Sequence, residues 1–174
     1  MSRPKLLKLF LFNSTWGPKE GEEDKKIVFF SPPETEINDQ VKTIGLIEAV
    51  VRFGQTFSSK PAHSLHTQKT RSVWKQVAPD FYLCFSVSVP SVKKTGKDGA
   101  EIQEYRPDDV SDRVLLGVLD KAYSMFSLFS GGLEYILREN NNDKNILRER
   151  VRHFYTRYLS TPCPQKNLEV CFWQ

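Results

Sequence analysis

The stretch with the most chemically versatile side chains is "SKPAHSLHTQKTRSVWK", residues 59–75, which holds two of the three histidines of the chain. Histidines three residues apart share one face of a helix, where they could bind one metal ion together. Pro61 and the many hydroxyl side chains instead favour a strand, and an odd separation along a strand directs two side chains to opposite faces. The sequence therefore predicts that His63 and His66 do not share a metal, and we expect no metal or other cofactor.

Nucleophilic catalysis needs a cysteine or serine beside a base and an orienting group. Cys84 lies within a predicted strand, where a small, weakly polar side chain usually belongs to the core. The third histidine, His153, lies on a predicted basic helix with no catalytic motif around it. These observations predict a protein that is not an enzyme.

A basic, glycine-containing segment, "PSVKKTGKDG" at residues 90–99, invites comparison with a phosphate-binding loop. It lacks the spaced first glycine of that motif and the hydroxyl residue after the lysine. We interpret it as the solvated tip of a hairpin, and the alternative is contact with anionic lipid headgroups. The lysines that would make this contact are Lys93, Lys94 and Lys97.

Composition is that of one ordinary globular domain: 174 residues, of which 39% are apolar and 12% aromatic. A net charge of +4 is weak evidence for nucleic-acid binding, and no strand combines basic and aromatic residues as RNA-binding sheets do. Three cysteines make no disulfide framework and favour a reducing compartment. No apolar run approaches the roughly 20 residues of a membrane helix, so the sequence predicts a cytosolic protein.

Three apolar runs predict strands. "KLLKLFLFN" is apolar on both faces, as is "IVFF", which follows a polar turn. Strands of this kind must be covered on both faces, and the two predict a hairpin at the centre of a sheet. "FYLCFSVSV", residues 81–89, alternates large apolar residues with smaller or more polar ones and predicts a strand with one apolar face.

Residues 37–57 have helical spacing and two apolar stripes. Ile37, Val41, Ile44, Ile47 and Val51 form one stripe, and Leu46, Ala49, Val50, Phe53 and Phe57 form a second, nearly opposite stripe. A helix on the outside of a small domain normally needs only one stripe, which packs on the core. The second stripe predicts further burial, within the domain or against a partner chain. As a working hypothesis the Ile44 stripe faces the core, although the spacing alone leaves the reverse open.

The remaining periodicity predicts two more helices. Apolar spacing is helical from Asp108 to Gly131 and Gly132, which end that helix, and Asp143 can cap a last helix. The order is then two strands, a helix, about three strands and two helices. It indicates an α+β fold with an antiparallel sheet that is covered by helices on both faces.

Longer stretches of the chain resemble the family of the vacuolar fusion protein Ccz, one half of the Mon–Ccz guanine-nucleotide exchange factor. They include "LFLFNSTWGPKEGEEDKKIVFFSP", "VKTIGLIEAVVRFGQTFSS", "LDKAYSMFSLFSG" and "RHFYTRYLSTP". The most specific pieces are "SLHTQKT" and "GPKEGEE". The likeness extends over roughly residues 7–161.

The resemblance implies a longin-like fold: a five-stranded antiparallel sheet with one helix on one face and two on the other. It also implies that two longin domains pair and act together as an exchange factor for a late-endosomal Rab GTPase, in endosome–lysosome and autophagosome fusion. The partners would be a Mon-type longin subunit and a small Rab GTPase, with an anionic membrane surface as a further contact and no nucleic acid. The residues that would carry the protein contacts are Lys42, Gly45, Leu46, Ala49, Val50, Arg52, Phe53, His66 and Gln68.

We expect residues 5–161 to form the longin-like domain. Residues 162–174 do not resemble the family, and we expect a tail there that packs back on the domain or is disordered. The expected location is the cytoplasm, with peripheral recruitment to late endosomes, lysosomes or vacuoles. The alternative function is that of a non-catalytic trafficking adaptor or tether with the same fold.

Overall fold

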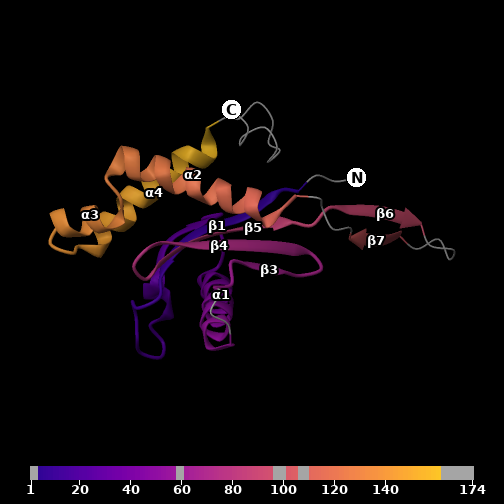
Figure 1. Cartoon of the computed structure of the whole chain (residues 1–174), viewed down its shortest axis with the longest axis horizontal. Coiled ribbons are helices and arrows are strands. Elements are labelled where there is room, and N and C mark those ends of the chain that lie inside the picture. The colour runs from indigo at the N-terminus through magenta and orange to yellow at the C-terminus, as the bar shows by residue number, and fades with distance from the viewer. Residues whose placement is uncertain (1–3, 58–60, 96–100, 106–109, 162–174) are drawn as a thin grey trace.

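A computed structural model describes residues 4–57, 61–95, 101–105 and 110–161. Five strands form one antiparallel sheet in the order β2-β1-β5-β4-β3. Helix α1 (Ile37–Phe57) covers one face of this sheet, and α2, α3 and α4 cover the other (Figure 1). The strands are β1 (Leu6–Asn13), β2 (Ile27–Ser31), β3 (Ser64–His66), β4 (Thr70–Ala78) and β5 (Phe81–Ser88).

From Leu9 to Phe12, both faces of β1 are apolar and buried, as its sequence predicts, whereas Leu6 and Leu7 are exposed. Leu9 and Leu11 belong to the core beneath α2, α3 and α4, whereas Phe10 and Phe12 belong to the core beneath α1. The expected α+β fold with a five-stranded antiparallel sheet is confirmed. The sheet is therefore the middle of three layers.

The centre of the sheet differs from the prediction. The central strand is β5, which pairs with β1 and β4, while β2 lies at an edge. β5 is also buried on both faces, because Cys84 is 0% exposed and Ser86 is 6% exposed. The Ser86 hydroxyl meets that of Ser72 on β4 at 2.7 Å, so its polarity is satisfied without water.

The second face carries three helices where two were expected: α2 (Asp112–Ser130), the short α3 (Leu133–Glu139) and α4 (Lys144–Ser160). α2 ends at Gly131, whose φ of 88° is one that glycine adopts easily. Asp143 caps α4 as predicted, because its side chain accepts hydrogen bonds from the first free backbone N–H groups. The buried side of α4 comprises Leu147, Val151 and Tyr155.

A two-stranded ribbon, β6 (Ser91–Thr95) and β7 (Glu101–Tyr105), extends beyond the sheet (Figure 1). It corresponds to the arms of the predicted hairpin. The backbones of Lys93 and Lys94 lie on β6, and Lys97 lies outside the described residues, as does the expected tail at 162–174. Lipid contact by these lysines and the boundary at 161 stay predictions.

Candidate interaction surface

Helix α1 (Ile37–Phe57) packs on the sheet with one side only. Ile44 and Ile47 are each 2% exposed and lie in one apolar cluster with Phe10 and Trp74 of the sheet. The hypothesis that the Ile44 stripe faces the core is confirmed. Ile37 is an exception, because this first residue of the helix is 53% exposed.

The opposite side of α1 is apolar and open. Leu46 is 52% exposed, Phe53 68% and Phe57 74%. The rings of Phe53 and Phe57 lie 4.6 Å apart between centroids, so they form one continuous apolar surface. We call this side the α1 outer face, and it comprises Lys42, Gly45, Leu46, Ala49, Val50, Arg52, Phe53 and Phe57. All of these residues are exposed except Val50, which is half-buried.

Gly45 leaves the helix backbone uncovered at one point of the α1 outer face, because it has no side chain. A Cβ atom at this position would meet no atom of the described residues within 4 Å, so packing within that part of the chain does not require glycine here. An approaching partner backbone can come closer to a glycine than to any other residue. The position therefore suits contact with a second chain.

A small charge network fixes the rim of the α1 outer face. Glu48 lies 2.6 Å from Lys26 and 2.6 Å from Arg52, and only the arginine is well exposed. Lys42 is exposed, with its Nζ 3.4 Å from the Asp39 carboxylate one turn away. An exposed pair of this kind contributes little to stability. The outer face thus combines an apolar centre with basic side chains at its border.

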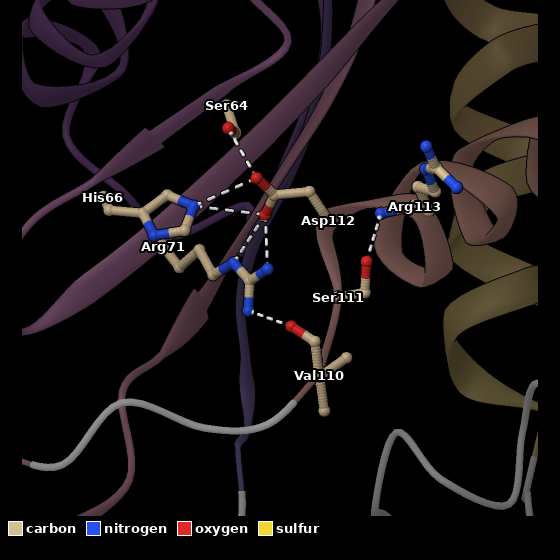
Figure 2. A network of polar contacts seen from close by, with 7 residues as sticks. All are labelled: Ser64, His66, Arg71, Val110, Ser111, Asp112 and Arg113. Atoms are coloured by element: carbon tan, nitrogen blue, oxygen red, sulfur yellow. Dashed lines mark hydrogen bonds and ion pairs between the residues drawn. The ribbon is translucent and has the colours of Figure 1, made fainter.

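A second polar cluster ties the edge strand β3 to the start of α2 (Figure 2). The carboxylate of Asp112 accepts hydrogen bonds from Ser64 Oγ at 2.8 Å and from Arg71 Nε at 2.7 Å, and it lies 3.1 Å from His66 Nε2. The guanidinium of Arg71 also donates to the carbonyl of Val110. We call Ser64, His66, Arg71 and Asp112 the β3–α2 clasp.

The clasp changes the titration of its carboxylate. Partial burial raises the pKa of Asp112, but the hydrogen bonds from Arg71 and Ser64 and the charge of Arg71 outweigh burial. The pKa therefore lies below the ordinary value of 3.8. The charged form of Asp112 is the one that this arrangement stabilises.

Of the expected contact residues, His66 does not lie on the same face of the sheet as those of α1. His66 and Ser64 point toward the face that α2 covers, while Leu65 between them packs on the α1 side. Gln68 is exposed in the turn between β3 and β4. The structure thus brings the α1 residues together and places His66 on the other face, where Asp112 engages it. Sequence periodicity could not show this contact, since the two residues are 46 positions apart.

Within the described ranges, no group of three or more His, Cys, Asp and Glu side chains is placed to hold a metal ion. The described helices include none that is both long and apolar enough to cross a membrane.

Comparison with known proteins identifies the family of this fold. Residues 6–131 match the family described as the "First Longin domain of INTU, CCZ1 and HPS4". The chain belongs to this longin family. Its α1 outer face and its clasp are accordingly features of a longin domain.

Several curated proteins that are similar to this chain share one name. A "Vacuolar fusion protein CCZ1 homolog" of Nematostella vectensis is 45% identical over 159 residues, which are 91% of this chain and 34% of the relative. Proteins of the same name from Xenopus laevis and Dictyostelium discoideum are 40% and 31% identical, over 91% and 86% of this chain and 33% of each relative. The chain thus spans about a third of the length of the curated relatives that it matches.

Proposed function

We propose that this longin domain is a subunit of a regulatory complex in vesicle fusion, which promotes nucleotide exchange on a small Rab GTPase. The observation that carries the proposal is the α1 outer face, an open apolar surface on a helix whose other side packs on the sheet through Ile44 and Ile47. The names of the relatives, which concern vacuolar fusion, support the same process.

The occupant of the α1 outer face would be a Mon-type longin subunit. Exposed aromatic side chains at the centre of a patch and basic ones at its border are the usual composition of a protein–protein interface. Phe53 and Phe57 would be the central anchors, and Arg52, held by Glu48, would lie at the border. The paired domains would then present a joint surface to the GTPase at late-endosomal, lysosomal or vacuolar membranes.

Exchange needs no covalent step. A factor that binds the nucleotide-free GTPase more tightly than the loaded form shifts the equilibrium toward nucleotide release. Side chains of this chain would contribute binding energy and shape, and the bond-making groups of an enzyme are unnecessary.

The test compares two substitutions on α1 with a matched control. Leu46→Asp and Phe53→Asp each place a charge on the open side, so we expect pairing to weaken at least tenfold in a titration with the Mon-type subunit. Thermal melting should stay within a few degrees of wild type, because both side chains are exposed. Gln55→Asp adds the same charge at an exposed position outside the stripe and should leave pairing intact.

The second half of the test is nucleotide release. With the partner present, the complex should accelerate release of a fluorescent GDP analogue from the Rab GTPase, and Phe53→Asp should abolish the acceleration. Pairing without any acceleration would favour the adaptor or tether function instead. Unchanged pairing by both outer-face variants would contradict the assignment of the interface.

A further inference from the structure

A second open surface lies on the other side of the sheet, between α2 and α4. The two helices line a groove of about 700 Å³. Its apolar part is made by Met125 and Phe129 of α2 and by Phe154 and Tyr158 of α4. Phe129 is 72% exposed, and the neighbouring Leu128, one position earlier on α2, is 79% exposed.

The α4 wall of this groove is basic. Arg150, His153 and Arg157 recur at steps of three and four along the helix and all line the groove. In the part of the chain that the structure describes, neither arginine forms an ion pair through its guanidinium. Among the described residues that line the groove, Glu149 is the only acidic one. The groove thus offers two unneutralised cations beside an apolar floor.

These features select the chemistry of an occupant. Two arginines seven positions apart on a helix are separated by about 10 Å along its axis. An amphipathic helix with two acidic residues at the same spacing could pair with both while its apolar face fills the floor. A flat lipid surface would meet the protruding side chains but would leave the space between the helices unfilled.

We propose that the α2–α4 groove, lined by Met125, Phe129, Arg150, His153, Phe154, Arg157 and Tyr158, docks an acidic amphipathic helix of a partner protein. This site is distinct from the α1 outer face, because the sheet lies between the two. The domain can therefore hold two partners at once, one on each side.

The experiment uses two synthetic helical peptides as probes. Both carry leucines along one face, and they differ only in having glutamates or lysines at two flanking positions seven residues apart. Fluorescence anisotropy should show that the glutamate peptide binds the full chain at least tenfold more tightly than the lysine peptide. Raising the salt concentration should reduce that preference.

Charge reversal gives the sharpest readout. The double substitution Arg150→Glu with Arg157→Glu should lose the glutamate peptide and gain the lysine peptide. Phe129→Ser should weaken both peptides, because it removes apolar surface only. Arg152→Glu is the matched control, since this exposed arginine of α4 lies outside the groove lining, and it should change neither affinity.

Other results would overturn the proposal. One is that neither peptide binds, or that both bind the double variant as they bind wild type. Another is that the arginine substitutions weaken only binding to phosphatidylserine vesicles, or only self-association of this chain measured by sedimentation. Phe53→Asp should leave peptide binding unchanged, so that failure here and failure of the proposed α1 interface are seen separately.

Discussion

The β3–α2 clasp makes a quantitative prediction for Asp112→Ala. The substitution removes the acceptor of Arg71 Nε and of Ser64 Oγ, and it leaves the guanidinium with the carbonyl of Val110. The Arg71 side chain is 9% exposed, so its charge remains largely away from water. We expect the free energy of unfolding to fall.

The size of the loss follows from the exposure of the two partners. Breaking a fully buried ion pair costs about 3–5 kcal/mol, and an exposed pair contributes about 0–1 kcal/mol. The Asp112 side chain is 35% exposed and Arg71 keeps the Val110 carbonyl as an acceptor, which places this pair between the limits. We expect a loss of about 2 kcal/mol, or about 4–8 °C in the melting temperature.

The pH dependence gives the sign of the effect. The folded-state pKa of Asp112 is lowered below its ordinary value of 3.8. A group with a lowered folded pKa stabilises the fold above its unfolded pKa, and this contribution disappears as pH falls through the folded pKa. The difference between wild type and Asp112→Ala should therefore be full at neutral pH and shrink in acid below about pH 4.

Urea denaturation followed by tryptophan fluorescence measures the difference, because Trp74 is buried in the native state. The control is Asp120→Ala on the same helix, which removes an exposed pair with Lys75 and should cost less than about 0.5 kcal/mol. The reasoning is refuted if both variants lose the same stability at neutral pH. It is also refuted if the loss in Asp112→Ala stays constant into acid.

Three smaller predictions concern the second face and the central strand. Asp143→Ala should cost about 1 kcal/mol in urea denaturation, because the backbone N–H of Asn145 loses its acceptor at 2.7 Å. Gly131→Ala should lower the melting temperature by several degrees, since φ is 88° and a Cβ would lie 2.5 Å from Cδ1 of Tyr135. Cys84 is fully buried and burial raises the pKa of its thiol, so peptide mapping should find it alkylated by iodoacetamide only after unfolding.

The periodicity of apolar residues was sufficient to predict which side chains share a face of a strand or helix. The two faces of β1 and the two stripes of α1 follow from spacing, because a residue's direction on a strand or helix is set by the backbone. The same reasoning placed Phe53 on the side of α1 away from the Ile44 stripe, and its side chain is 68% exposed there, while its contact with a partner stays a prediction.

The remainder depends on tertiary contacts that spacing does not encode. Ser86 is polar yet buried, because Ser72 on the neighbouring strand satisfies it. Met125 and Phe129 belong to an apolar stripe but stay open, because α4 covers only part of α2. His66 and Asp112 meet across 46 residues, and only the folded chain shows that this histidine is engaged within the domain.

The order of the strands and covering helices along the chain has a consequence for synthesis on the ribosome. All five strands and α1 are complete by Ser88, whereas the cover of the second face comes from residues 112–160. In a growing chain that has already paired its strands, Leu11, Leu83 and Phe85 are therefore exposed to solvent until α4 has emerged from the ribosome. Such transiently bare surface is a substrate for chaperones, and slower translation between these two regions should lengthen the time for which it is bound.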